Sequence, residues 1–428
     1  MITLVFEDEA YSNFLPLTYT KPIYGLKCGA YTNAERLISL APSTKIVLTC
    51  RAYLTAIARK VGPKVLVNNA EAIDDETLVV NGRVVPVEAN LAKLAIKGVT
   101  WVKNGDLVAC LLSDREVKDL WELILSGKSS ELLRRLREKG LEFKEAEGVE
   151  VLRYPWELLE LNPRLLSFDL SRMYGKAEGV IEEKAVVKGD RRSLIVEEEA
   201  EIEALSLIDV RKGPVFIGRG SVVQAGSRIT GPAYIGRNVV IQGAYVREGC
   251  VIGDYCRIGG GGEVEETIIH GYTNKYHYGF IGHSYIGEWV NLAAGTTNSD
   301  LKNTYGTVKV KVGDRRVDTG LLKVGCFIAD HVKTSIGSMI YTGVKIGVCS
   351  HIHGYVVGDV PSFTIWAQSL GRRPVELSLE SAIETARRMC SRRGVTLSDE
   401  ETEMLREVFK LTAEERRRAG VVAGQFKL

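Results

Sequence analysis

The chain has 428 residues, of which 45% are hydrophobic and 26% charged, with 56 Lys and Arg against 54 Asp and Glu. This length can hold two domains, and the composition is that of a globular protein rather than a disordered or membrane-spanning one. Because the net charge of +2 comes from interleaved acids and bases, a nucleic-acid partner is not expected. A membrane partner is not expected either, because no apolar run approaches membrane-spanning length.

The amino terminus and the cysteines both bear on the compartment. Residues 1–6 are apolar but are followed at once by acidic residues, unlike a secretory signal peptide. The eight cysteines are scattered singly, with no Cys-x-x-Cys pair, which favours buried free thiols over a disulfide framework. We therefore expect a cytoplasmic protein.

Residues 1–165 alternate short β-rich runs with helical segments, a pattern that predicts an α/β, Rossmann-like domain with a mostly parallel sheet. A hairpin is expected over 99–112, turning at Asn104-Gly105-Asp106, which is either a metal site or, more commonly for this sequence, only a turn. The expected strands are 2–6, 45–50, 64–67 and 77–80, and the expected helices are 51–60 and 116–125.

Charged residues near the amino terminus are candidates for phosphate chemistry. Glu7, Asp8 and Glu9 are consecutive carboxylates, which would repel a triphosphate unless a metal ion intervened. Lys21 and Lys27 either contact a phosphate group or lie solvated on the surface.

After a connector at 166–176, residues 177–373 carry a six-residue repeat. This period fits neither a helix nor a single strand, and it predicts a parallel β-helix whose three-faced coils place these side chains in one interior stack. The irregular early coils are expected to place Val180, Val187, Ile195, Ile202 and Ile208 inside. The regular interior positions are Ile217, Val223, Ile229, Ile235, Ile241, Val246, Ile252 and Ile258.

The repeat is interrupted in places that mark candidate sites. Between Ile241 and Val246 the spacing falls to five, so Arg247 takes the slot of the next interior residue. A second break, at 270–278, contains Lys275 and His277, and residues 306–320 are expected to form a protruding loop.

All six histidines lie within the predicted β-helix. A zinc site needs three converging imidazoles, whereas a general base needs only one. The spacing of these histidines does not indicate a zinc site, and we assign no metal ligand.

Residues 374–428 turn helical, with amphipathic spacing over 379–391 and 399–419. Their arginine-rich ends lie where cations complement a helix carboxyl end. We expect these helices to cover the end of the β-helix.

Two motifs and the repeat together resemble the GlmU-like family, bifunctional enzymes that acetylate glucosamine-1-phosphate and then uridylylate it. The motifs are Leu15-Pro16-Leu17-Thr18-Tyr19-Thr20-Lys21-Pro22 and Tyr154-Pro155-Trp156-Glu157-Leu158, and the nearest resemblance is to a divergent branch of sugar nucleotidylyltransferases. The resemblance implies a left-handed β-helix, a homotrimer, acetyl-CoA as co-substrate, a sugar phosphate and a nucleotide as ligands, and Mg²⁺ for the amino domain. The acidic run replaces the family's glycine-rich loop, and Arg83 stands where the family has a Mg²⁺-binding aspartate.

Residues 274–282 and 286–296 resemble the family's acetyltransferase motif. In that resemblance His277 is the general base, and Arg247 and Lys275 hold the substrate phosphate. Asn291 orients either the sugar hydroxyls or the acetyl group. Asp300 falls where the family has a second asparagine, and Phe280 replaces a tyrosine. The expected coenzyme A contacts are Ala294, Ala329, Lys333, Lys345 and Arg372.

These residue types suit the reaction. An amino sugar is protonated near neutral pH, so a base must remove a proton before its nitrogen attacks a thioester, and histidine titrates in this range. We expect a transferase that acetylates an amino-sugar 1-phosphate in the β-helix and transfers a nucleotidyl group to a sugar 1-phosphate in the amino domain. The alternative is a sugar-nucleotide-binding or scaffolding protein with an inactive amino domain.

Overall fold

The computed structural model describes residues 1–87, 90–173 and 178–426, and the chain divides into two compact units. The amino unit comprises Met1–Lys27 and Tyr31–Glu157, and the β-helix unit comprises Cys28–Ala30 and Leu158–Leu428. The predicted boundary between residues 176 and 177 lies outside the described residues. In the described part of the chain, no helix combines the length and the apolar character needed to cross a bilayer.

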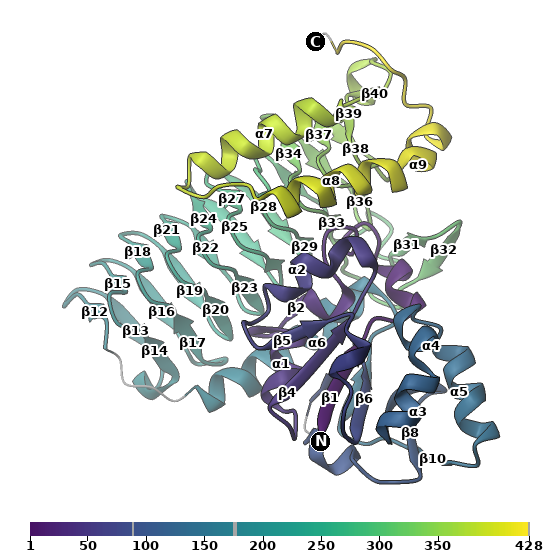
Figure 1. Ribbon diagram of the computed structural model, residues 1–428. Helices are drawn as coiled ribbons and strands as arrows, with labels where there is room; N and C mark the ends of the chain where they lie inside the picture. The colour runs from purple at the N-terminus through teal and green to yellow at the C-terminus, as the bar shows by residue number, and fades with distance from the viewer. Residues whose placement is uncertain (88–89, 174–177, 427–428) are drawn as a thin grey trace. The chain divides into compact units, whose positions relative to one another are not determined.

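One sheet forms the centre of the amino unit and confirms the predicted, mostly parallel Rossmann-like architecture (Figure 1). Central strand β1 lies parallel to β4 and β6, and β9 runs antiparallel to β6 and β8 because the Asn104-Gly105 turn reverses the chain. The strands in sheet order are β10 (Glu142–Glu145), β8 (Val99–Lys103), β9 (Asp106–Leu112), β6 (Thr77–Asn81), β1 (Ile2–Phe6), β4 (Lys45–Thr49) and β5 (Val65–Val67). A separate antiparallel pair is β7 (Val84–Pro86) with β11 (Val149–Val151).

Two helices of the amino part, α1 and α3, begin where the sequence supplies a cap. Thr32 with Glu35, and Ser113 with Glu116, form capping boxes that satisfy the first backbone N–H groups of α1 and α3. The predicted helix 116–125 is divided at Leu120 into α3 and α4, and the sequence analysis did not identify α1 or α5. The helices are α1 (Asn33–Ser39), α2 (Thr55–Arg59), α3 (Asp114–Asp119), α4 (Trp121–Leu125) and α5 (Ser129–Glu138).

Helix α6 (Pro155–Arg172) was also missed by the sequence analysis. It occupies most of the segment 166–176 that was expected to be a connector, because Leu166 and Leu170 are buried and continue its apolar side. The Asn162 side chain of α6 donates a hydrogen bond to the carbonyl of Gly249 in the β-helix, 2.8 Å away.

The second unit is a left-handed parallel β-helix whose described strands stack into three long faces (Figure 1). Face 1 contains β12 (Val180–Ile181), β15 (Glu201–Ile202), β18 (Val222–Gln224), β21 (Val240–Gln242), β24 (Arg257–Gly259) and β27 (Asn274–Lys275), and continues through Asn291 to β34 (Lys333–Thr334), β37 (His351–Ile352) and β39 (Thr364–Trp366), with β40 (Val375–Glu376) antiparallel to β39. Face 2 contains β13 (Val186–Lys188), β16 (Leu207–Asp209), β19 (Arg228–Thr230), β22 (Tyr245–Val246), β25 (Gly262–Glu265) and β28 (Gly279–Gly282), followed by β30 (Thr297–Asn298), β35 (Met339–Ile340) and β38 (Tyr355–Val356). Face 3 contains β14 (Leu194–Val196), β17 (Val215–Ile217), β20 (Ala233–Ile235), β23 (Cys250–Ile252), β26 (Ile268–Ile269), β29 (Tyr285–Ile286), β33 (Phe327–Ile328) and β36 (Lys345–Ile346).

The predicted interior stack is confirmed in the regular coils, where every predicted interior residue from Ile217 to Ile258 is fully buried in one core. Two positions in the early coils were wrong. Ile181 packs against this core while Val180 is 58% exposed, and Leu194 and Val196 face it in place of Ile195. The early coils are longer than three hexads, so the six-residue period did not show which residue of each strand points inward. Because adjacent residues of a strand face opposite sides, an error of one residue places the wrong side chain in the core.

Lys275 takes an interior position, in register with Ile258 of the preceding coil. Its side chain is fully buried, and its ammonium group donates to the carbonyl of His277. The predicted phosphate contact by Lys275 is therefore not supported in this arrangement, because the coil encloses the ammonium group.

The carboxyl-terminal elements lie near their expected positions in the sequence, but α7 packs against face 1 of the β-helix rather than over its end as expected. Strands β31 (Lys309–Val312) and β32 (Arg315–Asp318) pair as a hairpin within the predicted protruding loop (Figure 1). Helix α7 (Leu379–Ser391) matches the predicted range and buries Ala382, Ile383, Ala386 and Cys390. The second predicted helix is divided at Thr412 into α8 (Asp399–Leu411) and α9 (Ala413–Arg418).

Replacing Lys275 by Met should stabilise the protein. Burial lowers the pKa of Lys275 to about 8, below its value in an unfolded chain, so the unfolded state binds more protons between these two values. Stability should therefore rise with pH above about 8 in the wild type, and Lys275→Met should remove this contribution while adding about 1–3 kcal/mol at pH 7. Urea unfolding at pH 7 to 10 measures both effects.

Lys309→Met is the control, because Lys309 is exposed on the hairpin. A Lys275→Met protein that is no more stable than wild type at pH 7 would contradict the buried ammonium group.

Candidate active site

A pocket of about 550 Å³ lies between face 1 of the β-helix and helix α7. Its floor is a polar ladder, one outward-facing residue from each successive coil of face 1, held in register by strand pairing. The ladder residues in the pocket are Arg257, Asn274, Asn291 and Lys333. The remaining lining residues from the β-helix are Tyr276, His277, Leu292, Ala293, Ala294 and Ile336, and those from α7 and its end are Arg388, Met389, Arg392 and Arg393.

The pocket brings together the groups that acyl transfer requires. His277 is exposed at the corner after β27, with the Tyr276 ring centroid 6.0 Å from its own. Asn291 lies on the polar ladder, where its amide oxygen accepts from Asn274 at 3.5 Å. The backbone N–H of Ala294 donates to no described residue, although the Ala294 carbonyl accepts from Gly337. A base, an amide and an unpaired backbone donor therefore line one cavity.

Two of the predicted coenzyme A contacts, Ala294 and Lys333, line this pocket. Burial lowers the pKa of Lys333 to about 8, and its ammonium group donates to the carbonyls of Trp289 and His331 at 3.0 and 2.8 Å. The other three lie elsewhere. Ala329 is fully buried, Lys345 is on face 3 beside Asp359, and Arg372 is exposed outside the pocket.

Arg247 is not among the pocket residues. It follows β22 on face 2, where its guanidinium forms ion pairs with Glu263 at 3.2 Å and Glu265 at 2.9 Å. Its Nε–H is buried and has no hydrogen-bond partner among the described residues. A phosphate at Arg247 would therefore share the guanidinium with two carboxylates.

Asp300 belongs to a charged network on the same side of the β-helix. His283 donates from Nδ1 to Asp300 at 2.8 Å, and its Nε2 lies 3.3 Å from Glu266. Burial alone would lower the pKa of His283, but the hydrogen bonds to Asp300 and Glu266 outweigh burial and raise it to about 9. His283 is therefore an imidazolium at neutral pH.

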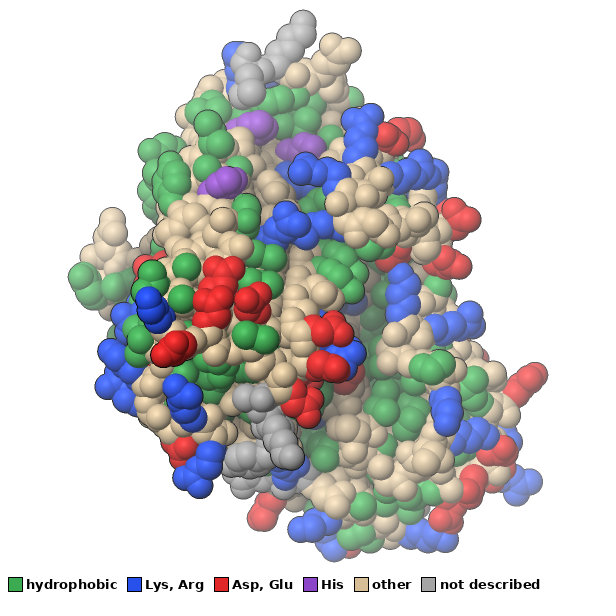
Figure 2. Space-filling model, turned by 90° about the vertical axis from the view of Figure 1, so that its left-hand side faces the viewer, with side chains coloured by type: hydrophobic (Ala, Val, Ile, Leu, Met, Phe, Trp, Pro, Cys, Tyr) green, Lys and Arg blue, Asp and Glu red, His purple; other side chains and the backbone are tan. Residues whose placement is uncertain are grey.

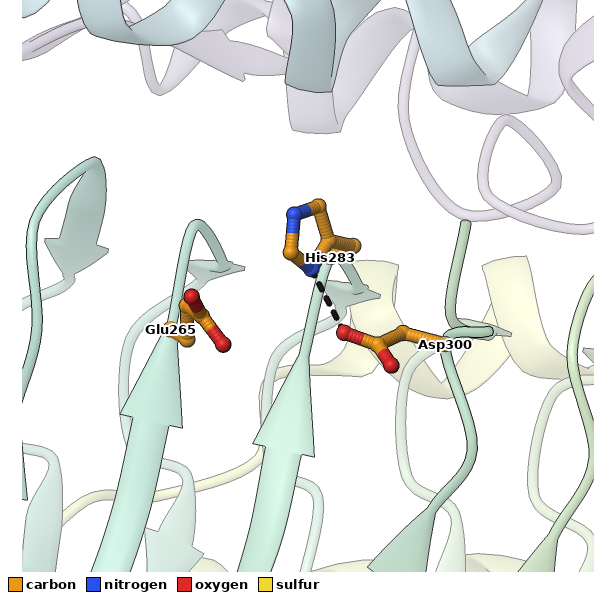
Figure 3. A group of neighbouring side chains, drawn as sticks. All are labelled: Glu265, His283 and Asp300. Atoms are coloured by element: carbon orange, nitrogen blue, oxygen red, sulfur yellow. Dashed lines mark hydrogen bonds and ion pairs between the residues drawn. The ribbon is translucent and has the colours of Figure 1, made fainter. Parts of the chain in front are cut away.

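Figure 3 shows His283 between Glu265 and Asp300, each from a different coil. Donor atoms of these three residues lie within 4.8 Å of one another, which is compatible with a metal site. An imidazolium cannot bind a metal, since both ring nitrogens carry protons. In this arrangement the group is a charge network, and the absence of a metal ligand stays a prediction.

In the amino unit, each carboxylate of the acidic run has a partner, and for Glu7 and Asp8 the partner is an arginine. Asp8 is fully buried and accepts hydrogen bonds from Arg83 at 2.6–2.9 Å, and Glu7 accepts from Arg51 at 3.0 Å. Glu9 accepts from the Ser129 N–H at 2.8 Å, at the first residue of α5, where a negative charge is favourable. The expected repulsion of a triphosphate by three free carboxylates is therefore wrong for this fold.

The residues near this run do not fit a Mg²⁺ ion as described. Both Asp8 oxygens bind Arg83, and Asp106, at the Asn104-Gly105-Asp106 turn, lies between Arg83 at 3.1 Å and Arg153 at 2.8 Å. Magnesium needs carboxylate oxygens that are open to it. Lys21 is buried and Lys27, in β2 (Lys27–Cys28), is half-buried, so neither is a solvated surface lysine.

Sequence analysis missed several pocket residues, among them Arg257, Asn274 and Tyr276. The outward position of Arg257 and Asn274 could have been predicted from the sequence. Each directly precedes an interior residue, and adjacent residues of a strand face opposite sides. The contributions of Arg388, Arg392 and Arg393 depend on where α7 packs, which no local pattern reveals. The sequence analysis gave the arginine-rich helix ends only one role, complementing the partial negative charge at the carboxyl end of a helix.

Comparison with known proteins places both activities among this chain's relatives. Residues 3–177 match the family described as sugar nucleotidyl transferase, and residues 232–265 match the bacterial transferase hexapeptide repeat. A bifunctional sugar-1-phosphate nucleotidylyltransferase/acetyltransferase of Sulfurisphaera tokodaii is 32% identical over 199 residues, which is 46% of this chain and 43% of that protein. The bifunctional protein GlmU of Methanocaldococcus jannaschii is 28% identical over 313 residues, covering 64% of this chain and 70% of that protein.

The chain is thus similar to these bifunctional transferases over part of its length. The predicted resemblance to GlmU-like proteins is thereby confirmed, although the match spans less than half of the Sulfurisphaera protein. Among solved structures, a UDP-N-acetylglucosamine acyltransferase from Bacteroides fragilis matches with a TM-score of 0.34 and 14% identity over 56% of this chain and 83% of that one. That score is too low to equate individual residues.

The His283 network should make stability depend on pH in a defined direction. Because the folded-state pKa, about 9, lies above that of an unfolded histidine, the stabilisation is complete below pH ~6.5 and is lost as pH rises through about 9. We expect His283→Gln to lower the free energy of unfolding by about 1–3 kcal/mol at pH 6 and by much less at pH 10. Urea unfolding of both proteins across this range measures the difference, and a difference independent of pH would contradict the assigned network.

Proposed function

We propose that the β-helix unit transfers the acetyl group of acetyl-CoA to the nitrogen of an amino-sugar 1-phosphate, with His277 as the general base. The observation that carries this proposal is the pocket, which contains His277, Asn291 and the unpaired N–H of Ala294. The relatives' names include acetyltransferase activity, which supports the same reaction.

The chemistry uses the chain's own groups at each step. The amino group attacks the thioester carbonyl carbon in its neutral form, after one proton has passed to solvent, and His277 accepts the second proton from the nitrogen during the attack. The Ala294 N–H donates to the oxygen that becomes negative in the tetrahedral intermediate. The C–S bond then breaks, and the proton passes from His277 to the leaving thiolate. Asn291 orients the acceptor or the acetyl group.

Arg247 and Asp300 are proposed to contact the acceptor, one through the unpaired Nε–H and the other through its carboxylate. Both lie past the ends of face 2 strands, and β28 separates the His283–Asp300 network from His277 by roughly 10 Å of strand. A sugar phosphate is long enough to extend along such a strand.

For the amino unit we propose nucleotidylyl transfer to a sugar 1-phosphate, with Lys21 and Lys27 as phosphate contacts. The family match over 3–177 and the relatives' names support this activity. We also propose a cytoplasmic homotrimer, on the resemblance to hexapeptide proteins.

Replacing His277 by Ala should lower kcat/KM for acetyl transfer by about 10²–10⁴-fold, the usual contribution of a general base. The assay follows thiol release from acetyl-CoA with glucosamine-1-phosphate, and UTP is then added to follow pyrophosphate release separately. If the variant lost thiol release but kept pyrophosphate release, the two activities would be assigned to different units.

His353→Ala is the matched control, because His353 belongs to the same unit but does not line the pocket. An unchanged rate in His277→Ala would remove the base assignment. If several amino-sugar phosphates and nucleotides gave neither thiol nor pyrophosphate release, a binding or scaffolding role would replace this proposal.

A further inference from the structure

Five cationic side chains among the described residues line the pocket beneath α7. Arg257 and Lys333 come from the polar ladder on the floor, and Arg388, Arg392 and Arg393 come from the last turn of α7 and the two residues after it. Figure 2 shows Lys and Arg side chains next to histidines in the upper part of the face drawn, and all six histidines belong to the β-helix unit.

Most of this charge is not neutralised within the described structure. No Asp or Glu is among the described residues that line the pocket, and only Arg388 has a carboxylate partner, Glu384 at 2.8 Å. Arg393 donates to the neutral amide oxygen of Asn274 at 2.5 Å, and neither Arg257 nor Arg392 forms an ion pair with a described residue. Burial first, and then the neighbouring Arg257 and Arg392, lower the pKa of Arg393.

Other arginines of the same unit are arranged differently. Arg247 has two glutamate partners, and the buried Arg416 lies 2.8 Å from Glu376. Like charges brought together without a counter-charge disfavour the folded state, and a bound polyanion relieves this repulsion. The pocket is therefore electrostatically suited to a ligand with several negative charges.

Arginine forks match phosphate oxygens, and the cavity volume is within the range of sites for cofactor-sized ligands. The same cavity holds His277 and the Ala294 N–H, so its ligand combines phosphate groups with a reacting group. Coenzyme A has this composition, with a diphosphate and a 3′-phosphate at the end opposite its thiol.

We infer that Arg257, Arg392 and Arg393 bind the phosphate groups of the acyl donor, so that α7 forms part of the coenzyme A site in addition to covering the β-helix. This inference rests on the proposed acetyl transfer and adds the side chains that recognise the donor. The phosphate of the acceptor could bind the same arginines, so binding measurements must distinguish the donor from the acceptor.

Titration calorimetry with the full chain tests the inference without requiring turnover. The ligands are coenzyme A, dephospho-coenzyme A, adenosine 3′,5′-bisphosphate and glucosamine-1-phosphate. We expect Arg392→Gln and Arg393→Gln each to weaken coenzyme A binding by about tenfold, since a charge-assisted hydrogen bond contributes at least this much. Binding of adenosine 3′,5′-bisphosphate should weaken in parallel, and added salt should reduce the difference between wild type and variants.

Arg387→Gln is the matched control, because Arg387 is exposed on the same helix, outside the pocket, and carries the same charge. Its coenzyme A affinity should equal that of wild type. Arg392 makes no side-chain hydrogen bond to a described residue, so Arg392→Gln keeps the test valid if Arg393→Gln loses its fold.

The outcomes separate this inference from the proposed reaction. Equal coenzyme A affinity in all variants, or no binding by wild type, would overturn it whatever the activity. If the substitutions weakened the binding of glucosamine-1-phosphate alone, the arginines would be assigned to the acceptor and the donor assignment would be overturned. Weakened coenzyme A binding in a protein that releases no thiol would support the inference and reject acetyl transfer.

Discussion

In-register stacking of coils is the constraint on which the β-helix unit depends. Each coil places its interior side chain directly above that of the preceding coil, as in the pair Ile258 and Lys275. Because neighbouring residues of a strand face opposite sides, fixing the interior stack also fixes an outward ladder. The aliphatic core thus positions Arg257, Asn274, Asn291 and Lys333 in one row, and the pocket is a consequence of hydrophobic packing.

The six-residue period made much of this unit predictable. It gave the interior residues of the regular coils, and the amphipathic spacing gave α7 to the residue. The period lost its phase in the longer early coils, which is why Val180 and Ile195 were misplaced. Lys275 was misjudged because its charge suggested a ligand contact, although its register with Ile258 required an interior position.

The arginines over the pocket could not be predicted in the same way. Their place in the site depends on how α7 packs against face 1, a contact between segments more than a hundred residues apart in sequence, as the Arg393–Asn274 hydrogen bond illustrates. In the amino unit, two departures from the related family compensate each other. The acidic Asp8 and the basic Arg83 each look unfavourable in sequence, but they form one buried ion pair.

A crystal structure of the protein grown with coenzyme A tests the central claim most directly. The account predicts the thiol end of coenzyme A near His277 and the Ala294 N–H, with phosphate oxygens within hydrogen-bond distance of Arg392 or Arg393. Coenzyme A bound away from face 1, with the pocket under α7 unoccupied, would contradict it.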